Sequence, residues 1–260
     1  MTWRLGVVGY PIEHSLTPQL HDAALAHLGL EGTSQRVAMK DPDAGALRAL
    51  MGDHYDALSV TMPLKETAAE VCDDYDDVAR RTGVVNSLLW REGRVHGACT
   101  DGPGFLDALL ANLGAVCQGM NVVVHGAGGA ARGIVDALVH ANAACVVVMG
   151  RTAANVERLT SAYDRVVDAT HELGHVDLVV NTQPVFSPAL GAFELPGVDA
   201  STVAIDITYE PRMSPWRQTY ADMGCRSANG LAMLAYQAAR QMQWWFQRDV
   251  DGAQLLAVIE

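Results

Sequence analysis

The sequence predicts an α/β protein of two domains. Short runs of β-branched residues alternate with longer segments of helical spacing, as in parallel sheets whose strands are joined by helices. A glycine-rich turn near the middle follows one such run and opens a helical segment, as in a doubly wound sheet of Rossmann type. The chain has 260 residues, of which 50% are hydrophobic, and this is enough for two cores of ordinary domain size.

The first part of the chain begins with a strand and a helix. RLGVVG predicts a strand, and TPQLHDAALAHLGL has apolar residues at helical spacing, with Thr17 as the expected cap and Pro18 at the first helical position. YDALSVTMP predicts another buried strand, which Pro63 ends. A turn-rich segment, CTDGPGF, precedes a predicted helix, FLDALLANLG.

A second series of strands follows and suggests the domain boundaries. It begins at MNVVVHGAGGAARG and continues with CVVVMG, VDLVVN and TVAIDI, spaced as in a doubly wound sheet. From about Asn229, GLAMLAYQAARQMQWWF predicts an apolar helix with no strand after it, and such a helix needs a surface to cover. We therefore expect domains at 1–101 and 102–228, with helices at 229–260 that pack back on the first domain.

Composition narrows the class of function. The 18 basic and 30 acidic residues give a net charge of −12, which repels phosphate backbones and anionic membranes, so we expect neither nucleic acid nor a membrane as a partner. Five scattered cysteines without a C-x-x-C spacing fit a reducing compartment. The N-terminus lacks a signal-peptide pattern and no apolar run approaches bilayer length, so we expect a cytoplasmic protein.

The glycine-rich turn predicts a dinucleotide site. Gly126, Gly128 and Ala131 have the spacing G-x-G-x-x-A, in which the glycines allow a tight turn and close approach of the pyrophosphate. The phosphates would then lie at a helix N-terminus. The next strand ends in VVVMGRTAAN, with no acidic residue but with Arg151, and this favours NADP over NAD. The alternatives are a turn that binds nothing and an arginine that is only a solvated loop cation.

Four polar clusters near strand ends predict a substrate cleft, because α/β sheets bind ligands at the carboxyl ends of their strands. The clusters are HSLT with Ser15 and Thr17, SVTMPLKE with Thr61 and Lys65, VVNS with Asn86, and CTDG with Asp101. Lys65 partnered by a carboxylate such as Asp101 could donate a proton to a carbonyl oxygen as hydride reaches the carbon. An exposed lysine at a helix start is equally compatible with the spacing.

The chain resembles the shikimate dehydrogenase family from its first strand to its last helix. Eight motifs in the family's order carry the resemblance: GYPIEHSLTPQLHD, SVTMPLKE, TGVVNSL, GACTDGPGF, GAGGAAR, GRT, DITYEP and NGLAMLAYQAA. The resemblance implies NADPH-dependent reduction of 3-dehydroshikimate to shikimate, on the route to chorismate and the aromatic amino acids. It also implies a discontinuous substrate domain around a central Rossmann domain, in a monomer or a homodimer.

The resemblance also implies roles for individual residues. The family's catalytic lysine and aspartate correspond to Lys65 and Asp101. The substrate carboxylate would be held by Ser15, Thr17 and Tyr209, and the ring hydroxyls by Asn86, Asp101, Thr61 and Gln237. The cofactor would be held by Gly126, Ala127, Gly128, Gly129, Ala130, Ala131, Arg151, Thr152 and Gly230.

Departures from the family pattern leave alternatives open. Thr17 replaces a common serine, as in members that also accept quinate. GRTAAN has Gly150 and Asn155 where the NADP clamp has asparagine and a second arginine, so NAD is a weaker possible cofactor. Cys99 replaces an asparagine, and NTQPVF differs from the family's loop beside the nicotinamide. The alternatives are a quinate/shikimate dehydrogenase with relaxed cofactor use and a catalytically silent NADP sensor.

HELGH, at residues 171–175, has the H-E-x-x-H spacing of zinc peptidases, which makes a metallopeptidase a remote alternative. Zinc binding there needs a helix that presents both histidines, and a third ligand. Gly174 costs about 1 kcal/mol in a helix interior, and Glu194 is a third ligand on sequence distance alone. We therefore expect no metal site, and place His171 and His175 on the solvent side of a short helix.

Overall fold

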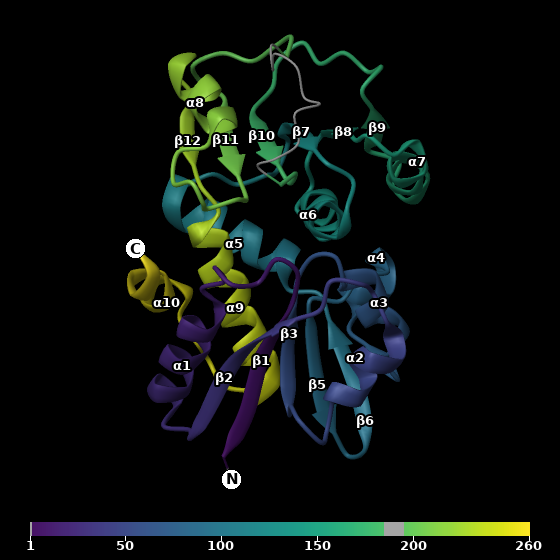
Figure 1. Cartoon of the computed structure of the whole chain (residues 1–260). Coiled ribbons are helices and arrows are strands. Elements are labelled where there is room, and N and C mark those ends of the chain that lie inside the picture. Colours follow the sequence, from purple (N-terminus) through teal and green to yellow (C-terminus); the bar gives the residue numbers. More distant parts are fainter. Residues whose placement is uncertain (1, 185–194) are drawn as a thin grey trace. The chain divides into compact units, whose positions relative to one another are not determined.

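A computed structural model describes residues 2–184 and 195–260. The chain forms two compact units: the first unit is Met1–Ala111 with Ala232–Glu260, and the second unit is Asn112–Leu231. Each unit contains a six-stranded sheet with helices around it (Figure 1). The prediction of an α/β protein with two sheets is confirmed.

The elements of the N-terminal part are β1 (Trp3–Gly9), α1 (Thr17–Leu28), β2 (Gly32–Ala38), α2 (Ala44–Leu50), β3 (Ala57–Val60), α3 (Lys65–Glu70), β4 (Asp74–Tyr75), α4 (Asp77–Thr82), β5 (Ser87–Arg91), β6 (Arg94–Ala98) and α5 (Asp101–Leu113). Those of the central part are β7 (Asn121–His125), α6 (Gly129–His140), β8 (Cys145–Met149), α7 (Ala153–Ala162), β9 (Val166–Asp168), β10 (Leu178–Asn181), β11 (Val203–Asp206), α8 (Pro215–Asp222) and β12 (Arg226–Ala228). The chain ends with α9 (Leu231–Phe246) and α10 (Gly252–Ile259).

The sheet of the first unit is mixed, with the order β2-β1-β3-β5-β6-β4. β1 pairs in parallel with β2 and β3, whereas β5 runs antiparallel to both β3 and β6. The alternation of strands and helices in the sequence indicates parallel pairing, and β5 departs from that pattern. Glu92 and Gly93 join β5 to β6 directly, and both have a positive φ, of 54° and 77°. Such a two-residue turn closes an antiparallel hairpin and leaves no room for a crossover helix.

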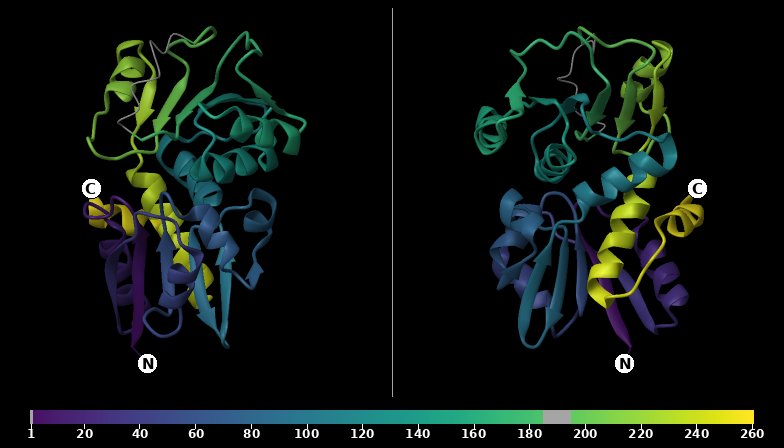
Figure 2. Two further views of the ribbon diagram at one scale, coloured as in Figure 1. Left: turned by 45° about the vertical axis from the view of Figure 1, so that its right-hand side comes forward. Right: turned by 180° about the vertical axis from the view of Figure 1, so that it is seen from behind.

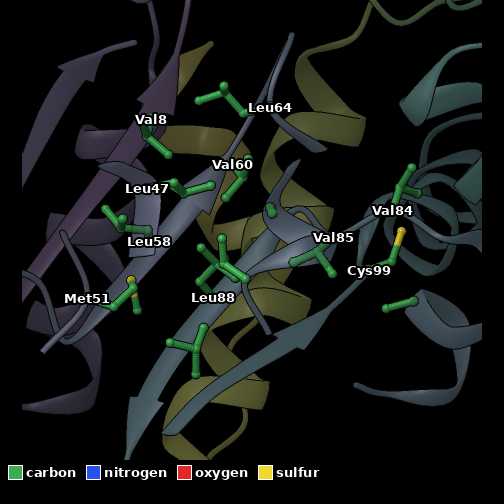
Figure 3. Packing of buried hydrophobic residues seen from close by; sticks show 14 residues of the cluster. Val8, Leu47, Met51, Leu58, Val60, Leu64, Val84, Val85, Leu88 and Cys99 are labelled. Atoms are coloured by element: carbon green, nitrogen blue, oxygen red, sulfur yellow. The ribbon is translucent and has the colours of Figure 1, made fainter. Parts of the chain in front are cut away.

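A buried apolar cluster lies between this sheet and helices α2 to α4. Figure 3 shows Leu58 and Val60 of β3 beside Leu88 of β5, Leu47 of α2 and Leu64 just before α3. These five side chains are at most 3% exposed. The cluster therefore fixes the end of β3 relative to the start of α3, and this is the segment that carries Thr61 and Lys65.

Helices α1, α9 and α10 lie on the other face of the first sheet (Figures 1 and 2). Trp3 of β1 contacts Phe246 of α9 edge to face, with ring centroids 4.8 Å apart. His21 of α1 contacts Trp245 of α9 in the same manner at 5.2 Å. The C-terminal helices thus complete the core of the N-terminal sheet.

Two helix starts differ from the sequence expectation. Thr17 is the first residue of α1 and not its cap, and the hydroxyl oxygen of Ser15 accepts the Thr17 N–H at 3.3 Å. α5 begins at Asp101, inside the segment expected to be a turn. Pro103 is tolerated there because N–H groups in the first turn of a helix have no acceptor within the helix, so the N–H that proline lacks is not missed. Gly104 is required because an added Cβ would lie 2.4 Å from Cα of Gln237 on α9.

The sheet of the second unit has the order β12-β11-β10-β7-β8-β9, and its strand pairs are parallel. The chain runs outward from β7 through β8 to β9, then returns to β10 on the other side of β7, which makes a topological switch point there. Trp216 and Tyr220 of α8 pack with Val123, Val147 and Val179 of the sheet. The predicted Rossmann-type sheet is confirmed.

No helix in the described ranges is long and apolar enough to cross a membrane.

Candidate active site

Lys65 and Asp101 form an ion pair inside the first unit. Nζ of Lys65 lies 2.5 Å from Oδ2 of Asp101, and the two side chains are 14% and 6% exposed. Each residue is the first of its helix, Lys65 of α3 and Asp101 of α5. A helix N-terminus stabilises a carboxylate, and restricted contact with water strengthens the attraction between the two charges.

Asn86 ties this ion pair to two other segments. Its amide nitrogen Nδ2 lies 2.9 Å from Oδ1 of Asp101, 3.0 Å from Oγ1 of Thr100 and 3.2 Å from Oε1 of Gln237. Its Oδ1 accepts the N–H of Thr100 at 2.8 Å, and this fixes which way the amide points. One carboxylate oxygen of Asp101 therefore accepts from Lys65 and the other accepts from Asn86. Together these two bonds fix the orientation of the Asp101 carboxylate.

The remaining predicted residues of the first unit lie at the carboxyl ends of β1 and β3 and at the start of α1. The carbonyl oxygen of Ser15 accepts two hydrogen bonds from Arg36, at 2.9 and 2.6 Å. Thr17 is 4% exposed. The N–H of Thr61 donates to Val8 at 2.9 Å, which places Thr61 beside the end of β1.

The predicted substrate residues thus fall into groups. The residues that bond to one another are Lys65, Asn86, Asp101 and Gln237. Ser15 and Thr17 form a second group, in which the Ser15 hydroxyl accepts the Thr17 N–H, whereas Thr61 donates its N–H to Val8 of β1. Tyr209 belongs to the second unit, where it is half-buried on the segment after β11.

Cys99 lies two residues before Asp101 and is 1% exposed. Burial raises the pKa of its thiol far above the ordinary value, and the Asp101 carboxylate raises that pKa further. The thiol is therefore uncharged and does not compete with Asp101 for Lys65.

The glycine turn of the second unit has the shape of a phosphate cradle. Gly126 has φ +117°, and an added Cβ would lie 2.0 Å from Oγ1 of Thr182, so no other residue fits. Gly128 is the N-cap of α6, and an added Cβ there would meet nothing within 4 Å. The space beside Gly128 is therefore open, as an anion that binds a helix start requires. Ala131 is fully buried.

The other predicted cofactor residues surround this turn or follow neighbouring strands. Ala127 is buried, and Gly129 and Ala130 begin α6. Arg151 is exposed and lies two residues after the end of β8, and Thr152 is the N-cap of α7. Gly230 donates its N–H to Thr208 at 2.9 Å, and a Cβ there would lie 1.8 Å from the carbonyl oxygen of Ile207.

The HELGH segment contains no helix, so the prediction of a short helix there is wrong. β9 ends at Asp168, whose carboxylate accepts the N–H and hydroxyl of Thr170 in a turn, and the chain stays irregular up to β10. Both histidines are exposed, and His175 contacts Asp177 at 3.3 Å. Within residues 2–184 and 195–260, no group of three His, Cys, Asp or Glu side chains could hold a metal ion. Glu194 and the end of NTQPVF, from Val185, lie outside the described residues.

Sequence reasoning missed four polar residues around Asn86. They are Thr100, His21, Ser59 and Gln241, and all are at most 6% exposed. Thr100 lies inside the quoted CTDG motif, and Gln241 follows Gln237 by one helical turn, so both had a signal in the spacing. A polar residue inside the buried strand ALSV, Ser59, was a third signal.

The chain is similar to known proteins over nearly its whole length. A family model described as the shikimate dehydrogenase substrate binding domain matches residues 7–88. A protein of Roseobacter denitrificans named shikimate dehydrogenase (NADP(+)) is 35% identical over an alignment of 269 positions. The alignment covers 98% of this chain and 96% of that protein.

Two solved structures extend the comparison to the fold. Shikimate dehydrogenase from Aquifex aeolicus has a TM-score of 0.88 and 25% identity, covering 100% of this chain and 98% of that one. Shikimate 5-dehydrogenase from Thermus thermophilus, solved in complex with NADP(H) and shikimate, has a TM-score of 0.84 and 33% identity, covering 98% of both chains. With about a third of its residues identical over nearly its whole length, the chain belongs to the shikimate dehydrogenase family.

Proposed function

We propose that this chain is an NADP-dependent shikimate dehydrogenase, which transfers hydride reversibly between NADPH and the C3 carbonyl of 3-dehydroshikimate to give shikimate. The observation that carries the proposal is the Lys65–Asp101 ion pair, held by Asn86, in a chain whose curated relatives have this name. A lysine beside a fixed carboxylate is a suitable proton donor for the reduction of a ketone.

Lys65 is assigned the proton transfer. Reduction of the carbonyl to a hydroxyl needs one proton at the oxygen, and the Lys65 ammonium has three N–H groups, of which one is directed at Asp101. In the opposite direction the neutral amine would take the hydroxyl proton. Asp101 holds the amine in place through the ion pair.

Bound NADPH supplies the hydride in this assignment. The glycine turn is suited to the pyrophosphate for two reasons. The space beside Gly128 at the start of α6 is open, and the close packing of Gly126 against Thr182 keeps the turn tight. Arg151 is assigned the 2′-phosphate, since it is the cation that follows the strand next to the turn, in a chain of net charge −12. The second unit is accordingly proposed as the NADP-binding domain and the first unit as the substrate domain.

The substrate is a small acid with several hydroxyl groups, and it needs several fixed polar partners. Asn86, Gln237 and Thr61 are assigned to the ring hydroxyls, with Asp101 shared between substrate and Lys65. Ser15 and Thr17 are assigned to the carboxylate, with help from Tyr209. Each partner that is lost leaves a buried polar group unpaired, at a cost of about 1–3 kcal/mol.

A cytoplasmic location is proposed with this function. All five cysteines are free thiols, which fits a reducing compartment.

A quinate/shikimate dehydrogenase with relaxed cofactor choice is the second candidate. It is favoured by Thr17, and by Gly150 and Asn155 in the segment that would hold the 2′-phosphate.

The test is a steady-state assay that crosses shikimate and quinate with NADP+ and NAD+. We expect the highest kcat/KM for shikimate with NADP+. Comparable kcat/KM values for quinate would instead support the second candidate, and no turnover in any of the four combinations would contradict both.

A further inference from the structure

A chain of hydrogen bonds runs behind Asn86 through side chains to which the proposed reaction gives no role. It links Ser34 of β2, His21 of α1, Ser59 of β3 and Gln241 of α9 to the backbone carbonyl of Asn86. His21 and Gln241 are fully buried and Ser59 is 6% exposed. Buried polar groups of this kind are costly unless each is satisfied, so their arrangement is strongly constrained.

The donors and acceptors of this chain can be assigned from its last member. The Asn86 carbonyl can only accept, so the Gln241 group at 2.9 Å from it is the amide nitrogen. The amide oxygen of Gln241 then faces Ser59, whose hydroxyl must donate to it. Ser59 consequently accepts from Nε2 of His21 at 2.9 Å, and Nδ1 of His21 accepts from Ser34 at 2.8 Å. The network allows one tautomer of His21, with its proton on Nε2.

The surroundings of His21 agree with a single ring proton. Burial lowers the pKa of His21 to about 4, so the ring is neutral at neutral pH. Trp245, one helical turn after Gln241, contacts the His21 ring edge to face and restricts its rotation.

The Asn86 carbonyl is held at both of its lone pairs. Val60 donates its backbone N–H at 2.8 Å and Gln241 donates its side-chain amide at 2.9 Å. On the other side of the residue, the Asn86 side chain bonds to Asp101 at 2.9 Å. A shift of the Asn86 backbone would therefore move the group that orients the partner of Lys65.

We propose that Gln241 and His21 are positioning residues, which hold Asn86 from behind so that its amide keeps Asp101 and Lys65 in the geometry for proton transfer. The expected effect on kcat rests on the proposed function. The expected position of the His21 ring proton rests on the hydrogen-bond network alone. A displacement of catalytic groups by about 1 Å can lower a rate about a hundredfold, so a residue outside the reaction can control turnover.

The kinetic test replaces Gln241 and uses Gln243 as its control. Gln241→Met keeps the side-chain length and removes both hydrogen bonds. Gln243→Met makes the same change on the same helix, at a half-buried residue that bonds to Asp249. We expect kcat for shikimate oxidation to fall about tenfold in Gln241→Met, with an unchanged KM for NADP+ and with the control close to wild type. Equal kcat values in the two folded variants would overturn the proposal.

The pH dependence of kcat in a third variant, Gln241→Glu, shows whether Gln241 acts through its hydrogen bonds or only by filling space in the core. A protonated glutamate in Gln241→Glu can still donate to the Asn86 carbonyl and accept from Ser59, whereas the ionised form cannot donate. The nearest titratable groups along these contacts are His21, behind Ser59, and the Lys65–Asp101 pair, beyond Asn86. We expect the kcat of Gln241→Glu, relative to wild type, to fall as the pH rises, and the ratio for Gln241→Met to stay level. A level ratio for both variants would contradict positioning through these bonds.

NMR shifts of the His21 ring nitrogens test the network independently of catalysis. We expect the wild-type protein to carry the proton on Nε2, and a proton on Nδ1 would overturn the assignment even if Gln241→Met failed to fold. An inactive wild-type enzyme with the expected tautomer would instead contradict the proposed function and leave the network standing.

Discussion

The ammonium nitrogen of Lys65 lies 2.5 Å from Oδ2 of Asp101, whose Oδ1 lies 2.9 Å from the side-chain amide nitrogen of Asn86. The three residues come from the start of α3, the start of α5 and the position before β5, so each is set by a rigid element. A site whose groups are held in place before the substrate binds avoids the entropy cost of ordering them during the reaction.

Arg151 should determine the preference for NADP. The variant Arg151→Ala removes the cation assigned to the 2′-phosphate, and a charge-assisted hydrogen bond of this kind contributes about 1.5–3 kcal/mol. We expect the affinity for NADP+ to fall about tenfold to a hundredfold and the affinity for NAD+ to change little, both measured by calorimetry. Arg80→Ala removes an exposed arginine of the first unit and is the matched control. Equal losses for the two cofactors would remove Arg151 from the phosphate site.

Thr17 should affect the choice between shikimate and quinate. Its side chain is buried at the start of α1, so its methyl group takes up space that a serine would leave empty. A single methyl group in such a site changes discrimination by about tenfold or more. We expect Thr17→Ser to shift the ratio of kcat/KM for quinate to that for shikimate, while Thr33→Ser, at an exposed position of β2, leaves it unchanged. An unaltered ratio in Thr17→Ser would show that Thr17 does not set specificity.

Stability should fall when the pH drops from neutral, because two buried histidines resist protonation. Burial lowers the pKa of His21 and of His125 from 6.5 to about 4. The unfolded chain binds these protons first as the pH falls through 6.5, so the stabilisation present at higher pH is lost between about pH 6.5 and pH 4. At about pH 5 the loss is about 2 kcal/mol for each histidine, from the linkage of proton binding to unfolding.

The measurement is urea unfolding at neutral and acid pH for the wild type and His125→Phe. The phenylalanine keeps a ring beside Trp216, whose centroid lies 6.0 Å from that of His125, and cannot take up a proton. Unfolding is monitored by tryptophan fluorescence. We expect the free energy of unfolding to depend less on pH in the variant than in the wild type. A pH dependence as steep as in the wild type would mean that His125 titrates normally in the folded protein.

The strands of the second unit could be predicted because each is a short apolar run between turn signals. VVVH, VVVM and LVVN are buried on both faces of a parallel sheet, and such strands are recognisable without knowledge of their neighbours. The hairpin between β5 and β6 was missed because Glu92 adopts a positive φ, of 54°, that glutamate rarely takes. Its turn carried a weak sequence signal.

Only part of the candidate site could be predicted, because it also contains contacts between residues that are far apart in the sequence. Strand ends predicted that Lys65, Asn86 and Asp101 would gather, since parallel and mixed sheets collect such residues at one edge. The approach of α9 to α5 at Gly104 and Gln237 joins residues far apart in the chain and cannot be derived from local spacing. In the HELGH segment the local spacing was misleading. It predicts a short helix, but the chain forms a turn at Thr170 and stays irregular up to the next strand.

The central claim is that Lys65 and Asp101 act as one proton-transfer unit. It is tested most directly by a double-mutant cycle on kcat for shikimate oxidation, with Lys65→Met, Asp101→Asn and the double variant. We expect each single change to lower kcat by about a hundredfold to ten-thousandfold, and the double variant to be no slower than the slower single one, with NADP+ binding unchanged. Losses that multiply in the double variant would show that the two residues act independently, and would contradict the account.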